Sequence, residues 1–364
     1  MAERFESIDV FRGIAVLQMI FWQTFDFFSK VDIYTDEPYY IPYLNMSIHA
    51  PGLAFFAFIS GVSVYVSVKR KLNNNTKKLD ILLHAIKRYG GYILLSLFFT
   101  TFVFGFRIFY IWREAIQGIG FAALIAVLLV LTFRSKWIFP SLALIIAFAQ
   151  PFLRKLLENS FIAQSYPLEP ASFNIFSNSV SIFLNSTIRG SFSLTHILPI
   201  LLGGVTLAIF LIRLHKKQLI KTSFITGLLL FFISIVMHFS FNKIDYYSWS
   251  PSYLVGFTGL SFLLFSLVEY LLLKFGKCKV TNFLGLFGKT AIIAYLFHFV
   301  VIYKPLEVFN LGNRLNQPMS YILTIISIII IYYSCKIWLL NKKAFLDKIK
   351  QITNNLFIYS KEHK

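Results

Sequence analysis

The amino-acid sequence predicts an all-α fold: a polytopic membrane helix bundle of about ten transmembrane helices. The first observation behind this is composition, because the 364 residues are 57% hydrophobic and only 14% charged, whereas globular domains carry about 25% charged residues. The second is that the apolar residues form runs close to the ~20 residues that a helix needs to cross lipid. A membrane barrel would instead show alternating strands of about ten residues, and none recur here.

The apolar runs are spread along the whole chain. Each is expected to be a helix, because unpaired backbone groups are too costly in hydrocarbon. They cover residues 13–29, 50–68, 89–106, 115–133, 137–153, 192–212, 223–241, 251–273, 283–303 and 319–340.

Basic residues predict the orientation of this bundle. Most of the 35 lysine and arginine residues fall on one face, around Arg12, between Lys69 and Arg88, and after Lys336. The opposite face holds the acidic segment 32–37. Since short loops rich in Lys and Arg tend to be cytoplasmic, both termini are expected in the cytoplasm of a multi-pass cell-membrane protein.

The formal net charge of +19 concerns partners. Basic clusters at helix ends are typical of contact with anionic lipid headgroups, so we expect membrane lipids and no nucleic acid. The cysteines, Cys278 and Cys335, form no CxxC or Cys/His cluster, and no metal site is expected. No linker divides residues 1–341, and residues 342–364 read as a basic amphipathic cytoplasmic tail.

Few ionisable or amide side chains interrupt the apolar runs, and each needs a partner or a function. Asp26 and Gln23 share one face of the first helix, and His49 follows across a short loop, where a carboxylate would orient its ring. His298 lies within the run 283–303. A histidine in a membrane helix can also serve only as a hydrogen-bonding link between helices.

Two further groups lie toward the cytoplasmic face. Asp9 and Arg12 are spaced i,i+3, which suits a salt bridge or the binding of an anionic ligand. Gly288-Lys289-Thr290 lacks the first glycine of a P-loop, because Phe283 occupies that position. No G-x-S-x-G motif occurs, so any chemistry is expected inside the bundle.

Several sequence blocks resemble the heparan-α-glucosaminide N-acetyltransferase-like family of transmembrane acyltransferases. The resemblance begins at the block Glu6-Ser-Ile-Asp-Val-Phe-Arg-Gly and continues through His49-Ala-Pro and Phe55-Phe-Ala-Phe-Ile-Ser-Gly-Val-Ser. Ala115-Ile-Gln-Gly-Ile-Gly, Ser250-Pro-Ser-Tyr-Leu and Gly288-Lys-Thr-Ala-Ile-Ile-Ala-Tyr-Leu-Phe-His follow in the family's order.

The resemblance implies an enzyme that takes acetyl from cytoplasmic acetyl-CoA and passes it to an amine or hydroxyl on the far side. His49 would be the base and Gln23 its helper, with Asp26 orienting His49. Gln117 and Gln23 would stabilise the developing oxyanion or hold the pantetheine. Arg12 and cytoplasmic lysines such as Lys289 would receive the CoA phosphates.

The expected acceptor is an extracytoplasmic glycan or a lipid-linked sugar. The sequence leaves open whether the protein forms a homodimer. Two features depart from the family: Gln23 replaces the usual Asn or His, and His49 stands two residues before Pro51. These departures motivate an alternative hypothesis, a non-catalytic membrane subunit with the same fold. Another alternative is a transporter with a midplane site, which inverted repeats and broken helices would support.

Overall fold

The computed structural model describes residues 5–30, 51–104, 115–158, 187–188, 193–240, 250–303, 308, 312 and 314–362. Within these ranges the secondary structure is helical, apart from an isolated bridge between Ser29 and Leu315. The predicted all-α fold is therefore confirmed.

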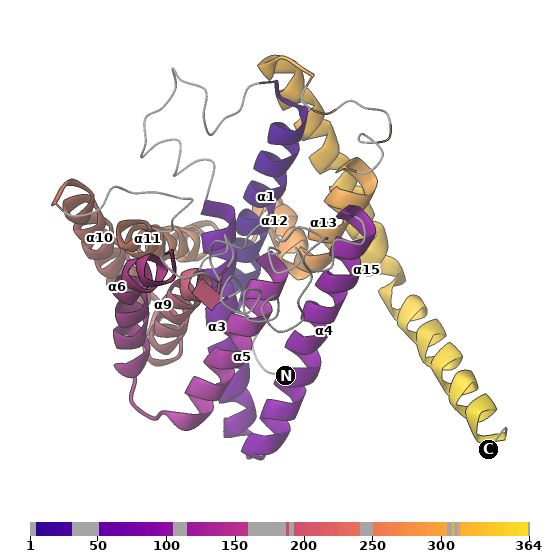
Figure 1. Ribbon diagram of the computed structural model, residues 1–364, viewed down its shortest axis with the longest axis horizontal. Coiled ribbons are helices and arrows are strands. Elements are labelled where there is room, and N and C mark those ends of the chain that lie inside the picture. Colours follow the sequence, from indigo (N-terminus) through magenta and orange to yellow (C-terminus); the bar gives the residue numbers. More distant parts are fainter. Residues whose placement is uncertain are drawn as a thin grey trace.

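The helices follow the predicted apolar runs (Figure 1). They are α1 (Glu6–Phe28), α3 (Pro51–Asn73), α4 (Lys78–Phe104), α5 (Ala115–Thr132), α6 (Ile138–Glu158), α9 (Leu194–Arg213), α10 (Lys216–Ser240), α11 (Pro251–Phe275), α12 (Lys279–Lys289), α13 (Ala291–Phe297), the π-helix η4 (His298–Tyr303) and α15 (Gln317–Glu362).

Seven helices of the described chain are long and apolar enough to cross a membrane: α3, α5, α6, α9, α10, α11 and the first part of α15. An eighth candidate is a broken span, since α12 and α13 pass the same test together but are bent by 78° at their junction. The protein is thus a multi-pass helical membrane protein. The predicted number of about ten spans is not confirmed, because α1 and α4 are interrupted by charged and amide side chains and fall outside the candidates.

The core lies where α3, α9 and α11 meet, and α6, α10 and α15 present apolar outer faces. Glycine brings α3 and α9 together. A Cβ on Gly204 would stand 1.8 Å from the carbonyl oxygen of Phe58, and one on Gly61 would stand 1.9 Å from that of Leu201. The two backbones are in direct contact at both positions, as small residues allow in membrane bundles.

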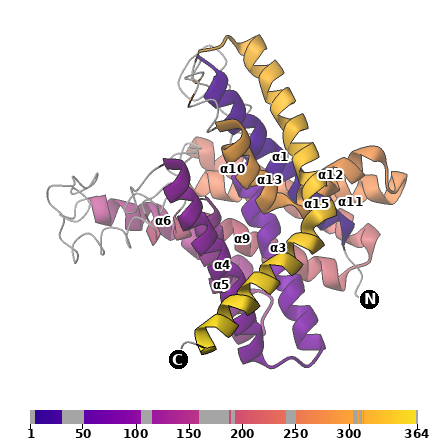
Figure 2. The same cartoon turned by 90° about the vertical axis from the view of Figure 1, so that its right-hand side faces the viewer.

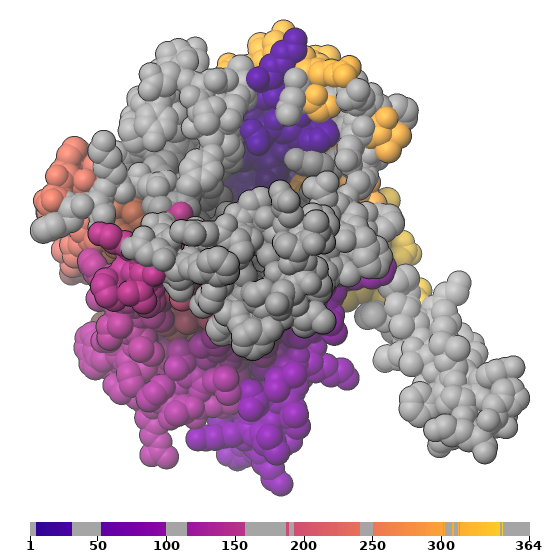
Figure 3. Space-filling view, in the orientation of Figure 1, coloured from indigo at the N-terminus to yellow at the C-terminus, as the bar shows by residue number. Residues whose placement is uncertain are grey.

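The end of α1 meets the start of α15 (Figure 3). The Leu315 N–H donates to the Phe28 carbonyl at 3.0 Å, and the Lys30 N–H donates to the Leu315 carbonyl at 3.0 Å. From there α15 continues without a break to Glu362 (Figure 2). Its C-terminal part projects beyond the bundle (Figure 1). No helix end marks residue 341, so the division into a domain and a tail stays a prediction.

Candidate active site

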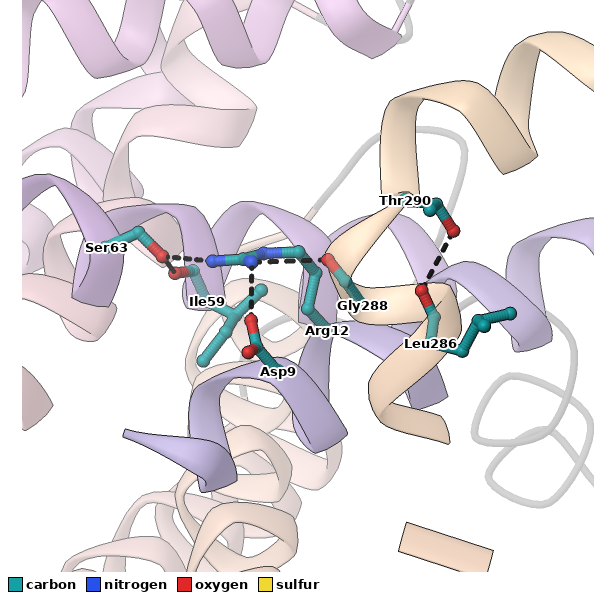
Figure 4. A network of polar contacts seen from close by, with 7 residues as sticks. All are labelled: Asp9, Arg12, Ile59, Ser63, Leu286, Gly288 and Thr290. Carbon is teal, nitrogen blue, oxygen red and sulfur yellow. Dashed lines mark hydrogen bonds and ion pairs between the residues drawn. The ribbon is translucent and has the colours of Figure 1, made fainter. Parts of the chain in front are cut away.

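Arg12 is the centre of a polar network between α1, α3 and α12 (Figure 4). Its Nη1 donates to Asp9 Oδ1 at 3.2 Å and to the Gly288 carbonyl at 3.3 Å, and its Nη2 donates to Ser63 Oγ at 2.6 Å. Ser63 Oγ donates in turn to the Ile59 carbonyl at 2.8 Å. Hydrogen bonds to a charged group contribute about 1.5–3 kcal/mol each, so this network fastens three helices together.

Local structure explains why Gly288 can accept this bond. The last carbonyls of a helix have no partner within it, and Gly288 is the penultimate residue of α12. A Cβ at Gly288 would lie 1.8 Å from the Asp9 carbonyl oxygen, so glycine permits the approach. Asp9 and Arg12 point the same way because they are one helical turn apart.

A cavity of about 390 Å³ opens beside this network. We call it the basic cavity, because its walls carry four basic side chains and no acidic residue is among the described residues that line it. The charged and aromatic members of the wall are Arg12, Arg88, Lys289, Lys342, Tyr89, Tyr92 and Trp338. Such a wall favours an anionic ligand.

Arg88 is held against the aromatic part of the wall. Its guanidinium carbon lies 5.5 Å from the Tyr89 ring centroid, and its Nε donates to the Tyr92 hydroxyl at 3.4 Å. A cation over an aromatic face gains about 0.5–1 kcal/mol at exposed sites. The guanidinium of this exposed side chain is therefore oriented along α4.

The structure brings together three of the residues predicted to bind the acyl donor. Arg12 and Lys289 both line the basic cavity, and Asp9 is the buried ion-pair partner of Arg12. Gln117, the fourth, is buried on α5 between the cavity-lining residues Ile116 and Ile119. In the described part of the chain neither polar atom of its amide has a hydrogen-bond partner.

The residues predicted for catalysis are more dispersed. At 1.5 Å per residue, Gln23 and Asp26 lie roughly 16 and 21 Å along α1 from Arg12. Gln23 is partly buried, and its Oε1 has no hydrogen-bond partner within the described ranges. His49 lies outside the described residues, so its predicted contact with Asp26 stays a prediction.

His298 is fully buried at the start of η4. Its Nδ1 pairs with the Tyr295 carbonyl, and no described residue makes a hydrogen bond to Nε2. Its ring centroid lies 4.0 Å from that of Phe299. Phe299 belongs to an apolar cluster that also contains Tyr92 and Ile116, two residues of the cavity wall. His298 thus contacts the apolar cluster that adjoins the wall of the basic cavity, and π-helical turns are frequent at functional sites.

Sequence reasoning missed Arg88 and Lys342, which complete the basic wall. The available signal was spacing: Arg88 and Tyr92, like Trp338 and Lys342, are four residues apart and share a helix face. Aromatic and basic residues paired in this way are typical of the membrane interface, and the sequence alone assigned Arg88 and Lys342 only to the basic cytoplasmic face.

The sequence blocks cited above converge on the cavity. Arg12, Ser63 and Gly288 belong to three of them, and Ile116 and Gly120 to a fourth. Residues 4–179 match the family model for heparan-alpha-glucosaminide N-acetyltransferase, catalytic. This region of the chain is therefore similar to that family. No curated protein matches the chain.

The acetyltransferase match covers α1 to α6 and supplies Arg12, Ser63 and Arg88 to the cavity. Lys289 and Lys342 come from beyond the matched residues. The basic cavity is therefore shared between the matched residues 4–179 and the C-terminal half of the chain.

Proposed function

We propose that this protein is a cell-membrane acyltransferase that takes an acyl group from cytoplasmic acyl-CoA, acetyl-CoA in the simplest case. The acceptor would be an amine or hydroxyl of an extracytoplasmic glycan or lipid-linked sugar. The observation that carries the proposal is the basic cavity, with Arg12, Arg88 and Lys289 on separate helices around one space. The similarity of residues 4–179 to an acetyltransferase family supports transfer of acetyl.

The cavity fits the chemistry of coenzyme A. Phosphates bind well to guanidinium and ammonium groups, and Arg88, Lys289 and Lys342 would hold them. The Tyr89, Tyr92 and Trp338 rings offer faces on which the adenine of CoA could stack. Apolar residues of the same wall, such as Ile116 and Ile119, suit a pantetheine chain. When bound, acyl-CoA supplies an activated thioester as acyl donor.

Proton transfer remains with the histidines. His49 would accept the proton of the acceptor, and Asp26 would orient its ring. General-base catalysis of this kind raises the rate by about 10²–10⁴-fold. The amides of Gln23 and Gln117 would donate hydrogen bonds toward the negative charge that develops. His298 is the second candidate base, because its Nε2 lacks a protein partner in the described chain.

Donor binding and base assignment are tested separately. Acetyl-CoA at about 100 times its dissociation constant should stabilise the purified protein by about 2.7 kcal/mol, and Arg88→Gln with Lys289→Gln should abolish that stabilisation. Arg134→Gln, an exposed arginine away from the cavity, serves as the matched control. His49→Ala should reduce acetyl transfer to residual levels. Full activity in both His49→Ala and His298→Ala would refute histidine base catalysis.

The orientation has its own test in the native cysteines. Cys278 is exposed at the start of α12, and Cys335 is buried. Hydrogen bonds from the Thr281 backbone and side chain lower the pKa of the Cys278 thiol, which favours the reactive thiolate. An impermeant thiol reagent should label Cys278 only from the cytoplasmic side. Labelling from outside would reverse the orientation and exclude a cytoplasmic donor.

One observation favours a transporter instead. Broken spans line the central sites of many transporters, and α12 and α13 form one with a 78° bend. A matching break in the other half is not seen in the described residues. Substrate flux in proteoliposomes without acyl transfer would support transport. The absence of both substrate flux and CoA binding would support a non-catalytic subunit.

A further inference from the structure

The end of α3 and the start of α4 form a tight hairpin at the lower end of the bundle in Figure 1. The Thr76 N–H donates to the Lys71 carbonyl at 3.0 Å. Asn75 has a φ of 57°, a left-handed conformation that asparagine adopts more readily than most residues. The chain is thus folded back within a short turn, and Lys71 at the end of α3 lies beside the first turns of α4.

Basic side chains gather at this hairpin. The positive charge of Lys71 lowers the pKa of His84, and burial and the charges of Arg88 and Lys87 lower it further. Among the described residues, no acidic side chain is one of the charges that act on this ring. We call Lys71, Lys87 and Arg88 the hairpin cluster. Positive charges brought together in this way attract an anion.

Arg88 belongs to the hairpin cluster and to the basic cavity at the same time. Its side chain lines the cavity beside Tyr89 and Tyr92, whereas Lys71 and Lys87 are not among the described residues of the cavity wall. An anion at the hairpin cluster would therefore be held by two lysines that lie outside the wall. Through Arg88 it would also neutralise part of the positive charge that the cavity presents.

The outer face of α4 indicates which anion fits the hairpin cluster. Lys87 shares this face with Leu83, four residues before it, and Leu94, seven residues after it. The two leucines are 55% and 67% exposed. Tyr89 and Tyr92, which follow the cluster on α4, are a residue type that marks the membrane interface. A dissolved anion gains nothing from the apolar surface, whereas a phospholipid brings a phosphate and hydrocarbon together. The cluster therefore suits the headgroup of an anionic phospholipid, which basic residues at the cytoplasmic leaflet attract.

We propose that Lys71, Lys87 and Arg88 bind the headgroup of one anionic phospholipid of the cytoplasmic leaflet, and that this lipid weakens binding of the acyl donor. The lipid site is independent of the proposed function, whereas its effect on the donor rests on that function. The lipid phosphate and the donor phosphates would share the Arg88 guanidinium. Each ligand then lowers the affinity of the other by the same factor.

The experiment measures the dissociation constant of acetyl-CoA for the full chain in nanodiscs of phosphatidylcholine, with and without added phosphatidylglycerol. Phosphatidylglycerol should raise this constant about fivefold, the factor that corresponds to one basic contact at a membrane surface. In Lys71→Gln with Lys87→Gln, the rise should shrink to the part caused by the general surface charge of the nanodisc. Lys216→Gln with Lys217→Gln is the matched control and should keep the full rise. These two lysines are exposed at the start of α10 and are not among the described residues that line the cavity.

An equal rise in the two double variants, or no rise in the wild type, would overturn the inference. Inorganic phosphate in phosphatidylcholine nanodiscs gives the second comparison. A rise of the same size that is lost in Lys71→Gln with Lys87→Gln would assign the hairpin cluster to small anions and overturn the lipid assignment. If acetyl-CoA does not bind in phosphatidylcholine alone, the proposed function fails, and native mass spectrometry still tests the lipid site. The wild type should retain more phosphatidylglycerol than Lys71→Gln with Lys87→Gln, and equal retention would remove the site.

Discussion

Two cavities in the described part of the chain have opposite character. The basic cavity is lined by Arg12, Arg88, Lys289 and Lys342. The second, which we call the apolar cavity, measures about 150 Å³ between α6, α9, α10 and α11, and its polar lining consists of Thr206, Thr226 and Thr258. Thr206 and Thr258 donate to carbonyls of their own helices at 3.0 and 2.8 Å. The Thr206 and Thr258 hydroxyls thus bond within their own helices, whereas Arg12 links three helices.

The difference teaches how to separate a binding site from a packing defect in a membrane bundle. A polar group that bonds to its own helix needs no other partner. In the basic cavity the like charges of Arg88, Lys289 and Lys342 repel one another, although all three side chains are exposed. An anionic ligand would offset that repulsion, which makes the basic cavity the better candidate for a binding site.

The largest expected effect is at Arg12. Arg12→Ala would leave the buried Asp9 carboxylate without its guanidinium, and breaking a buried pair in this way costs about 3–5 kcal/mol. Arg12→Lys keeps the positive charge but loses the guanidinium fork that reaches Ser63 and Gly288. Its stability should lie between those of the wild type and Arg12→Ala. Thermal unfolding in detergent measures both. A wild-type melting temperature for Arg12→Ala would remove Arg12 from the centre of the site.

Gly288 comes next in size. Gly288→Ala forces α12 away from the Asp9 carbonyl, and overpacking against backbone typically costs about 1–3 kcal/mol. Gly285→Ala on the same helix is the matched control, because a Cβ there would meet no atom within 4 Å. Gly288→Ala should also weaken acetyl-CoA binding, since Lys289 moves with the helix. Equal melting temperatures for the two variants would contradict the close contact.

These two residues also mark how far sequence alone reached. The helix positions followed from apolar runs. Asp9 and Arg12 were found from their i,i+3 spacing, and Lys289 from the Gly288-Lys289-Thr290 motif. The 78° bend between α12 and α13 was missed, because the run 283–303 reads as one continuous span. Arg88 and Lys342 were missed because the direction in which an interfacial cation points depends on which helices flank it.

The apolar cavity should tolerate change. Thr258→Val replaces a hydroxyl that bonds only to the Leu254 carbonyl of its own helix, so the change in unfolding free energy should be about 1 kcal/mol or less. Acetyl-CoA binding should be unaffected. A large loss of binding in Thr258→Val would show that the two cavities are coupled.

The smallest expected effect concerns the basic side chains around His84 on α4. The positive charge of Lys71, followed by burial and the charges of Arg88 and Lys87, lowers the pKa of His84. Removing one of these charges makes protonation easier, so Lys71→Gln should raise the pKa of His84 toward its ordinary value. Titration of the His84 ring by NMR measures the change. An unchanged pKa would mean that this end of the molecule is less positive than the structure implies.

The hydrogen bond from Arg12 to Gly288 joins residues 276 positions apart in the chain. At about 5–20 residues per second, the ribosome finishes α12 roughly 15–55 s after α1. During that interval Arg12 has Asp9, one turn away on its own helix, as a ready counter-ion. The Asp9 carboxylate therefore neutralises Arg12 during synthesis as well as in the finished fold, because both residues belong to α1 and are present before α12 has been made.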